Sequence, residues 1–523
     1  MFIKIFLLLI FFAITITVGL YFRKRATNVN DFVLGGRAVG PWLSAFSFGA
    51  TYFSAVVFVG YAGQFGWRFG TAAVWIGLGN AFIGSLMAWF VLGRRTRIMT
   101  NHLKSATMPE FFGSRYMSSA LKIGASIIVF VFLIPYTASL YNGLSRLFAM
   151  AFGSIGISFE HCVIAMGVLT AIYVVAGGYF ATAVNDFIQG TITVVGIVAV
   201  IAVALSSKGG FSSAIDSMAR IPDTTVAPGA FTSFFGPDPV SLLGVFLLTS
   251  LGTWGLPQMV ARFYSIKSEK MITKGAIVST IFAILVAGGC YFLGSFGRLF
   301  SDNPTVAMPA DGFDSIIPGI ITGFNSDVIM GIVVVLVFAA SISTLSSLVM
   351  ASASTLTLDF LKGHIIKNMS GKKQLLIIRS LIVVFIIISS VVAIFQYQGG
   401  VTFIAQLMGV SWGALAGSFL APFLYGLYWK RASRVSIWCN FIFSTAVMIL
   451  NILFRSSFPT ILQSPINAGA FCMLAGFVIV PLVSAFTKAP DKNKVEGFFS
   501  CYSQTVTVKA SEVLVDAGAD SEN

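Results

Sequence analysis

The sequence predicts an all-α polytopic membrane protein with thirteen transmembrane helices. Its composition is the first observation, because 57% of the 523 residues are hydrophobic and 10% are charged, whereas a soluble domain has about 25% charged residues. The second observation is a series of thirteen apolar stretches, each long enough to cross a bilayer, which takes about 20 helical residues. The third is that 26 of the 33 Lys and Arg residues lie in every second gap between these stretches.

The apolar stretches occupy nearly the whole chain and predict one transmembrane domain, residues 1–486. A polar tail follows, residues 487–523, and its low hydrophobicity predicts a disordered cytoplasmic segment. The predicted spans are, in chain order, 3–22, 42–66, 71–92, 122–150, 159–177, 184–206, 239–263, 272–297, 328–358, 375–396, 402–428, 435–454 and 467–486.

The first span is interpreted as a retained helix and not as a cleaved signal. Only Lys4 precedes the apolar run, whereas Arg23, Lys24 and Arg25 follow it. A signal peptide has its positive charges in front and a small-residue cleavage site behind. The reverse polarity of this segment predicts a helix whose N-terminus is outside the cell.

The basic residues orient the rest of the bundle. Lys and Arg stay in the cytoplasmic loops of membrane proteins, so the gaps that hold most of them are predicted to be cytoplasmic, with the C-terminus inside. We expect a multi-pass protein of the plasma membrane, with short helices in two long outer loops, 207–238 and 298–327. The few basic residues predicted outside are Lys4, Arg68, Arg146, Lys208, Arg220, Arg298 and Arg455.

Several classes of protein are excluded. The formal charge of +14 comes from short loops and forms no basic stripe, so nucleic-acid binding is not expected. The five cysteines show no CxxC pairing, which argues against a metal site or a disulfide framework. No span contains paired carboxylates, HExxH or a nucleophile motif, so an enzyme is not expected. A sensor is disfavoured because no kinase-like domain follows the last span.

The second and seventh spans are interrupted by small and polar residues. Gly and Pro weaken the helical hydrogen-bond ladder, and the freed backbone groups are tolerated in a bilayer only where they line a protein cavity. Kinked helices that pack through small residues are the alternative. The residues concerned are Gly49, Thr51, Tyr52 and Ser54 in the second span, and Thr249, Ser250, Gly252, Thr253, Gly255 and Pro257 in the seventh.

The two interruptions are more informative together than separately. The second and seventh spans lie five crossings apart, so they run in opposite directions and each begins a five-helix unit. The units, about 42–206 and 239–428, are predicted inverted repeats, with spans 1, 12 and 13 peripheral. Paired interruptions at matching places in two inverted halves indicate the binding site of a transporter.

One carboxylate lies at membrane depth. Asp186 opens the sixth span in the run TAVNDFIQG. Charges inside a membrane are costly and are usually functional. A helix cap at the interface is the alternative.

Eight hydroxyl side chains crowd the ninth span between residues 341 and 355. Hydroxyls in membrane helices often bond back to their own carbonyls, which explains scattered members of the set. Ser343, Ser346 and Ser347, however, are spaced to share one helix face. Hydroxyl and carbonyl oxygens are hard ligands, and the scarcity of nearby charge favours a monovalent ion over Ca²⁺.

These residues resemble the sodium:solute symporter family, with motifs nearest to its sodium/pantothenate and sodium/proline branches. The resemblance covers roughly residues 25–435. The motifs are DFVLGGRAVGPW (31–42), GATYFSA (49–55), GGYFATAVNDFIQG (177–190), GLPQMVARF (255–263), AASISTLSSL (339–348) and LYGLYWKRA (424–432).

The resemblance implies a LeuT-type fold with thirteen helices, two inverted five-helix repeats and sodium as the coupling ion. It implies a first sodium site formed by Ala50, Phe53, Ala340, Ser343 and Thr344. Some members, a sialic-acid symporter among them, have a second sodium site. The corresponding residues here are Asp186, Ser343, Ser346 and Ser347, which leads to the hypothesis of two sodium ions per turnover.

The expected function is sodium-coupled import of a small organic solute, preferably a carboxylate such as pantothenate or a monocarboxylate. The family's sodium/proline symporter has an Asp in its first broken helix and aromatics in its second, whereas this chain has Tyr52, Thr249 and Thr253 there. Proline transport, and a carrier of the same fold without sodium, remain the alternatives. The pocket is expected between spans 2, 4, 7 and 11, lined by Thr51, Tyr52, Ser54, Asn142, Thr253, Trp254 and Gln406.

Arg37, in the GGR loop, is either an inner-gate residue or an ordinary loop charge. The expected partners are the solute, sodium and the lipid bilayer, with no obligate protein partner.

Overall fold

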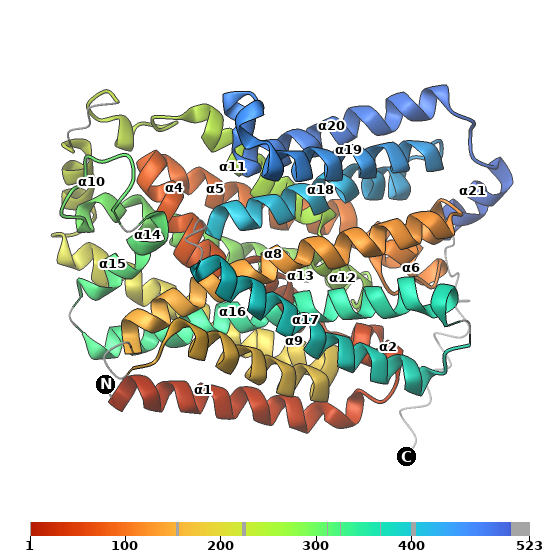
Figure 1. Ribbon diagram of the computed structural model, residues 1–523, viewed down its shortest axis with the longest axis horizontal. Coiled ribbons are helices and arrows are strands. Elements are labelled where there is room, and N and C mark those ends of the chain that lie inside the picture. The colour runs from red at the N-terminus through yellow and green to blue at the C-terminus, as the bar shows by residue number, and fades with distance from the viewer. Residues whose placement is uncertain are drawn as a thin grey trace, which may run out of the picture.

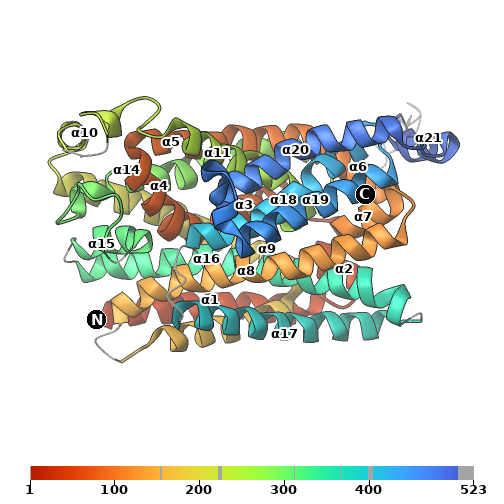
Figure 2. The same ribbon diagram turned by 45° about the horizontal axis from the view of Figure 1, so that its top comes forward.

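Long helices that run side by side along the longest axis make up almost all of the structure (Figures 1 and 2). The computed structural model describes residues 2–152, 156–221, 226–310, 312–324, 326–366, 368–398 and 404–503. Within these ranges every regular element is a helix, apart from two isolated β-bridges. The all-α prediction is confirmed.

The α-helices that the text refers to are these, in chain order: α1 Phe2–Tyr21, α2 Val29–Leu34, α3 Pro41–Tyr52, α4 Ala62–Phe69, α5 Val74–Gly79, α6 Arg94–His102, α7 Met108–Arg115, α8 Ser119–Phe152, α9 Phe159–Ser207, α10 Phe211–Ala219, α11 Pro239–Leu251, α12 Pro257–Tyr264, α13 Met271–Ala283, α14 Gly289–Ser295, α15 Ile316–Thr322, α16 Asp327–Thr355, α17 Gly371–Gln398, α18 Ile404–Tyr428, α19 Arg434–Leu453, α20 Pro465–Phe486 and α21 Lys492–Phe499.

Ten helices of the described chain are long and apolar enough to cross a membrane, and the bent pair α11–α12 makes an eleventh. Two of the ten, Val56–His102 and Phe159–Ser207, contain 47 and 49 residues. A straight helix of that length would measure about 70 Å, against about 30 Å for the hydrocarbon core. Each therefore contains two crossings, and the total becomes the thirteen that the apolar stretches predict.

The reversal in α9 occurs at Gly178. This residue has φ 59° and ψ −158°, a backbone conformation open to glycine because it has no Cβ. Tyr173 before it bonds to the Ile342 carbonyl, and Gly196 after it lies against Leu336. A straight helix would put Tyr173 and Gly196 about 35 Å apart, so the chain must double back to reach neighbouring turns of α16.

The reversal between the second and third spans occurs at Gly70, where φ is 60° and ψ is −137°. Figure 1 places α4 and α5 near one end of the bundle and α6 at the other. The chain thus returns along the bundle after α4, and the intervening residues keep their helical hydrogen bonds through π-helical turns over 80–87 and 89–93.

The two interrupted helices run antiparallel, as predicted. At one end, the Val39 N–H just before α3 donates to the Ser265 carbonyl just after α12, at 3.2 Å. At the other end, Thr71 Oγ1 after α4 donates to the carbonyl of Phe231, which precedes α11, also at 3.2 Å. Both helices are broken in the middle, and α11 and α12 meet at an angle of 46°.

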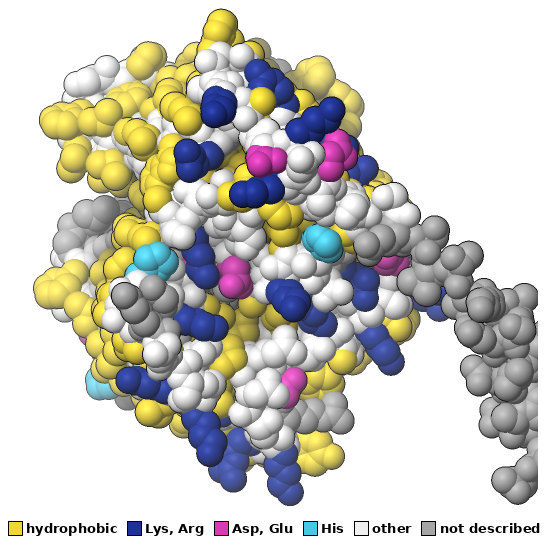
Figure 3. Space-filling view, turned by 90° about the vertical axis from the view of Figure 1, so that its right-hand side faces the viewer, with side chains coloured by type: hydrophobic (Ala, Val, Ile, Leu, Met, Phe, Trp, Pro, Cys, Tyr) yellow, Lys and Arg dark blue, Asp and Glu magenta, His cyan; other side chains and the backbone are white. Residues whose placement is uncertain are grey.

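One end of the bundle is strongly basic. Figure 3 shows this end face-on, with Lys and Arg spread across it and few carboxylates between them. It includes α6, α7 and α21, and is called the basic end below. The opposite end carries the short helices α10 and α15 (Figure 1), which lie in the two loops where the sequence predicts short helices.

The segment after the last span differs from its prediction of disorder. Residues 487–503 include α21, whose Val495 is buried. Lys430 and Glu496 form an ion pair at 2.8 Å, and the Arg95 guanidinium lies over the rings of both Tyr428 and Tyr502. A short apolar face and these contacts anchor the segment to the basic end. The rest of the predicted tail, 504–523, lies outside the described residues.

Candidate functional site

The site begins at the break in the first interrupted helix. α3 ends at Tyr52, and Phe53 is extended, with φ −103° and ψ 93°. The last carbonyl oxygens of a helix have no N–H partner within it. Residues 47–62 are all buried, so these oxygens need partners from neighbouring elements.

Two hydroxyls of α16 supply partners. Ser343 Oγ lies 3.0 Å from the Ala50 carbonyl oxygen, and Thr344 Oγ1 lies 3.1 Å from the same atom and 3.2 Å from the Thr51 carbonyl oxygen. Both hydroxyls also lie near the Ala340 carbonyl oxygen, at 3.1 and 3.3 Å. Three carbonyl and two hydroxyl oxygens thus converge between α3 and α16, and we call this group the oxygen junction.

The oxygen junction contains four of the five residues expected at the first sodium site: Ala50, Ala340, Ser343 and Thr344. The fifth, Phe53, lies at the break itself, where its N–H donates to the Gly49 carbonyl at 2.9 Å. The junction also contains the carbonyl oxygen of Thr51, which the sequence does not predict. An uncharged set of oxygens on two separate helices suits a weakly charged, hard cation.

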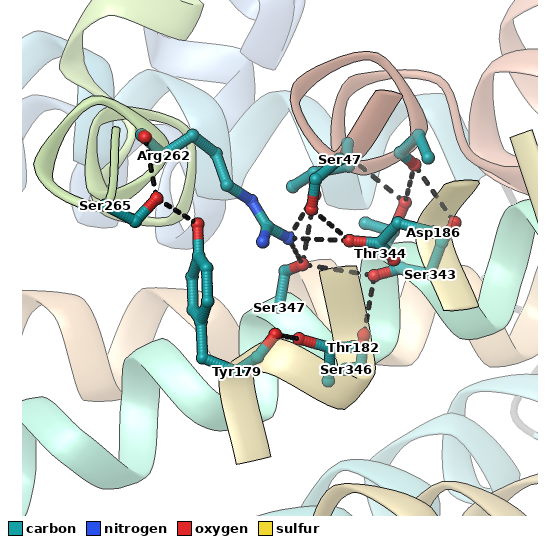
Figure 4. A network of polar contacts seen from close by, with 12 residues as sticks. Ser47, Tyr179, Thr182, Asp186, Arg262, Ser265, Ser343, Thr344, Ser346 and Ser347 are labelled. Carbon is teal, nitrogen blue, oxygen red and sulfur yellow. Dashed lines mark hydrogen bonds and ion pairs between the residues drawn. The ribbon is translucent and has the colours of Figure 1, made fainter. Parts of the chain in front are cut away.

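The residues expected at the second sodium site lie beside the junction (Figure 4). Asp186 is fully buried two turns after the reversal in α9, and its carboxylate accepts a hydrogen bond from Ser47 of α3. A helix cap at the interface, the alternative for Asp186, is therefore wrong. Ser346 and Ser347 bond back to the Ser343 carbonyl.

Arg262 is the residue of this site that sequence reasoning missed. The count of loop charges assigns Arg262 to the cytoplasmic gap at the end of the predicted span 239–263, but the residue lies on α12 inside the bundle and is 2% exposed. Its Nη2 atom donates to Thr51 Oγ1 at 2.7 Å, to Asp186 Oδ2 at 3.2 Å and to Ser347 Oγ. The loop interpretation is wrong because α12 continues two turns beyond the break before it reaches the basic end.

Three residues expected to bind the solute lie at the break of α3. The Tyr52 hydroxyl donates to the Thr249 carbonyl of the other broken helix. Ser54 Oγ accepts a hydrogen bond from the Val56 N–H at 3.2 Å. The Thr51 hydroxyl contacts Arg262 and therefore belongs to the cation sites.

Of the other four expected solute residues, Thr253 lies at the break of the second interrupted helix with its side chain beside the Tyr52 hydroxyl, and the remaining three bond elsewhere. The indole N–H of Trp254 donates to the Ile83 carbonyl, and the Thr253 hydroxyl to the Ser250 carbonyl. Asn142 lies 3.4 Å from Gln396. Gln406 accepts a hydrogen bond from Arg455 and borders a separate cavity.

Aromatic side chains surround the break instead. The Trp412 ring of α18 lies 6.2 Å from that of Tyr52 and 5.9 Å from that of Tyr136 on α8, and Tyr52 stacks on Phe53 at 4.2 Å. Among the described residues neither the Tyr136 hydroxyl nor the Trp412 indole N–H makes a hydrogen bond of good geometry, although the Tyr136 hydroxyl lies beside the Trp412 and Ser54 side chains. We call these four residues the aromatic cluster. The signal for Tyr136 and Trp412 in the sequence is weak, since aromatic residues are frequent throughout the chain.

A narrow cavity leads from the basic end toward these sites. It is bordered by α2 and α7 at that end (Figures 1 and 2) and reaches Gln258, Arg262 and Ser347 in the interior. Its wall includes the polar side chains of Thr107 and Thr355. The cavity is thus lined both by residues of the basic end and by residues of the second site.

Arg37 ties elements together at the basic end. Its guanidinium donates to the carbonyls of Ser105 (2.7 Å) and Tyr264 (3.3 Å), and partial burial lowers its pKa. The residue has a φ of 55°, a left-handed conformation that is unfavourable for a side chain. These bonds link the loop before α3 to the loop between α6 and α7 and to the end of α12, and the choice between an inner-gate residue and a loop charge stays a prediction.

The comparisons with known proteins agree with this architecture. The family model described as "Sodium:solute symporter family" matches residues 32–438. Sodium/proline symporter 2 of Staphylococcus saprophyticus is 28% identical over 495 residues, which cover 92% of this chain and 93% of the relative. The osmoregulated proline transporter OpuE of Bacillus subtilis is 28% identical over 486 residues, 92% of this chain and 94% of that protein.

Among solved structures, the outward-open, substrate-bound state of a Na⁺-coupled sialic acid symporter has a TM-score of 0.72 and 19% identity. The match covers 94% of this chain and 99% of that chain. This likeness supports the LeuT-type fold. The chain belongs to the sodium:solute symporter family: it is a membrane transporter and not an enzyme, and sodium is its co-transported ion.

Proposed function

We propose that this protein imports proline, or a closely related amino acid, together with sodium across the plasma membrane. The observation that carries sodium coupling is the oxygen junction. Its oxygens belong to α3, which is interrupted, and to α16, which is continuous, so an ion bound there would hold the two helices together. Sodium binding would thereby select one arrangement of the bundle.

The preference for proline rests on two observations. The two relatives named above are proline transporters, and the aromatic cluster offers ring faces beside the break of α3. Aromatic faces pack against an apolar ring and attract a cationic amine. An ammonium group can therefore bind here without a carboxylate partner, and the lack of such a partner was the reason that the sequence alone favoured a simple carboxylate.

A small carboxylate such as pantothenate or a monocarboxylate is the second candidate. The hydroxyl of Tyr136 and the indole N–H of Trp412 are buried donors that make no hydrogen bond of good geometry in the described chain. Both can donate to a carboxylate, and charge-assisted hydrogen bonds are the stronger ones. Proline also has a carboxylate, so these donors serve either solute, and the ring faces favour proline.

The transport cycle follows from linkage between the two ligands. Sodium at the oxygen junction stabilises the state open to the outside, and the solute then closes the outer path. The unit formed by α3–α6 and α11–α14 rocks against the other helices, and both ligands leave through the cavity at the basic end. The membrane potential contributes about 2.3 kcal/mol per charge for each 100 mV.

Uptake into proteoliposomes tests the proposal. With an inward sodium gradient, we expect concentrative uptake of radiolabelled L-proline that stops when choline replaces sodium. Unlabelled L-proline should inhibit this uptake, whereas pantothenate and lactate should not. Sodium-driven uptake of a carboxylate without proline uptake would favour the second candidate, and uptake of any solute that persists undiminished without sodium would refute sodium coupling.

The orientation is a separate proposal, with the basic end in the cytoplasm. Lys and Arg are retained on the cytoplasmic side of membrane proteins, and they gather at that end (Figure 3). We expect a fluorescent protein fused to the C-terminus to be bright and a periplasmic or extracellular phosphatase fused there to be inactive. The opposite pair of results would reverse the orientation.

A further inference from the structure

A single nitrogen atom contacts two of the residues expected at the second cation site, Asp186 and Ser347. Arg262 Nη2 lies within hydrogen-bond distance of oxygens from three different helices: Thr51 of α3, Asp186 of α9 and Ser347 of α16 (Figure 4). Thr51 Oγ1 and Ser347 Oγ are themselves 3.0 Å apart. Oxygens that converge on one point from several elements are the arrangement that a bound cation requires, and here a guanidinium nitrogen takes that place.

The charges in this site balance for one cation only. Asp186 provides the single carboxylate among the residues that contact Arg262, and both side chains are almost completely buried. A second positive ion beside them would leave one uncompensated charge in a place of low dielectric constant, which is strongly unfavourable. Sodium and the Arg262 guanidinium therefore compete for Asp186.

The Arg262 side chain also has an alternative position. It borders the cavity at the basic end, and its guanidinium carbon lies 5.1 Å from the centre of the Tyr179 ring. Its Nε atom has no hydrogen-bond partner among the residues described. A guanidinium can stack on an aromatic face while it is hydrated, so rotation of the side chain toward Tyr179 and the cavity would expose Asp186 to another cation.

The position of Arg262 in the moving unit links this exchange to transport. α12 belongs to the unit proposed to rock, whereas Asp186 and Ser347 lie on α9 and α16, outside it. Rocking therefore changes the distance between the guanidinium and its partners. Arg262 approaches Asp186 in the arrangement seen here, in which the cavity at the basic end reaches the site.

We propose that Arg262 is a tethered cation that competes with a sodium ion for Asp186 and expels that ion toward the basic end. The inference rests on the proposed sodium symport and adds a residue that releases the second ion. It predicts that Arg262 weakens sodium binding, although a buried partner of a site residue would ordinarily be expected to support binding.

Sodium titration of the purified protein tests the inference. Substituting Arg262→Gln removes the competing charge, so we expect the apparent sodium affinity to increase about tenfold and the Hill coefficient to rise. Asp186→Asn removes the shared partner and should abolish this gain when combined with Arg262→Gln. Arg298→Gln is the matched control, because Arg298 is a buried arginine that bonds to the Trp67 carbonyl far from Asp186, and its sodium affinity should equal that of the wild type.

Chemical rescue separates competition from a structural role. In Arg262→Ala, added methylguanidinium should weaken sodium binding in a concentration-dependent way, and it should have no such effect on Arg262→Ala/Asp186→Asn. If the neutral variants are poorly folded, Arg262→Lys, which keeps the charge on a shorter side chain, provides the measurement and should increase sodium affinity by a smaller factor.

Unchanged or weaker sodium binding by folded Arg262→Gln, together with no effect of methylguanidinium, would overturn the inference. That failure differs from failure of the proposed symport. In the first case the wild type still binds sodium through Ser343 and Thr344, whereas in the second it shows no sodium binding at all.

Discussion

Replacement of both Ser343 and Thr344 by alanine is expected to abolish sodium-driven uptake. These hydroxyls supply two of the five oxygens of the oxygen junction and are its links from α16 to the Ala50 carbonyl. A polar contact to a charged group contributes about 1.5–3 kcal/mol, so the loss of two contacts should weaken sodium affinity by about 100-fold or more. Sodium-dependent quenching of intrinsic tryptophan fluorescence measures the affinity, and uptake into proteoliposomes measures the coupling.

A matched pair of hydroxyls on the same helix provides the control. Ser341 and Thr357 are also buried, but their hydroxyls donate to carbonyls of their own helix, those of Val337 and Ala353. Ser341→Ala/Thr357→Ala should therefore keep its sodium affinity within about twofold, since only local bonds are lost. Wild-type sodium affinity in the Ser343→Ala/Thr344→Ala variant would show that the coupling ion binds elsewhere.

The two double variants also distinguish a missing ion site from a misfolded protein. Both remove two buried hydroxyls from one helix, so their direct effects on packing are comparable. A similar melting temperature with different sodium affinity would locate the effect at the junction. Equal loss of both properties in both variants would instead indicate that the hydroxyls only stabilise the helix.

The fold could be predicted from the sequence because its signals are repeated and additive. Apolar stretches recur thirteen times and clusters of basic residues recur in six of the seven segments predicted to be cytoplasmic, so a single ambiguous segment is corrected by its neighbours. Even so, the predicted break between the fifth and sixth spans is one residue, Gly178, within a helix that otherwise continues from Phe159 to Ser207. The hydropathy of α9 shows two crossings, but only backbone geometry shows how tightly they are joined.

The candidate ion-site residues can be predicted from the sequence where their arrangement depends on spacing within one helix. Ser343, Ser346 and Ser347 share a face by their spacing alone, and the break of α3 is visible in its residues. Arg262 was missed because its charge was counted with the loop that follows it. A charged residue near a helix end can lie in the adjoining loop or can pair with an opposite charge inside the bundle. The sequence does not distinguish the two for Arg262, because its partner Asp186 lies 76 positions earlier.

The solute residues were the hardest to predict because they depend on side-chain directions. Trp254 and Trp412 are both tryptophans of spans expected to line the pocket. The Trp254 indole N–H bonds to the Ile83 carbonyl, whereas that of Trp412 makes no hydrogen bond of good geometry in the described structure. Spacing along a helix cannot distinguish these two situations, since each depends on which backbone oxygen the neighbouring helix presents.

The second large prediction therefore concerns substitutions of Trp412. Its ring lies beside those of Tyr52 and Tyr136, and under the proposed function its N–H would donate to the solute carboxylate. Trp412→Phe keeps an aromatic ring and removes the donor, so we expect the KM for proline to rise about tenfold, as for one hydrogen bond to a charged group. Trp412→Ala also removes the ring surface, and the KM should then rise about 100-fold.

Sodium affinity and the choice of tryptophan make this prediction specific. Because the oxygen junction lies on α3 and α16, sodium binding without solute should change by less than about twofold in both Trp412 variants, even though coupling transmits solute effects to the ion when both are present. Trp254→Phe is the control: it loses a bond within the protein, so its melting temperature should fall while its KM stays near that of the wild type. If Trp254→Phe raised the KM and Trp412→Phe did not, the solute would bind at the pocket that the sequence predicts and not at the aromatic cluster.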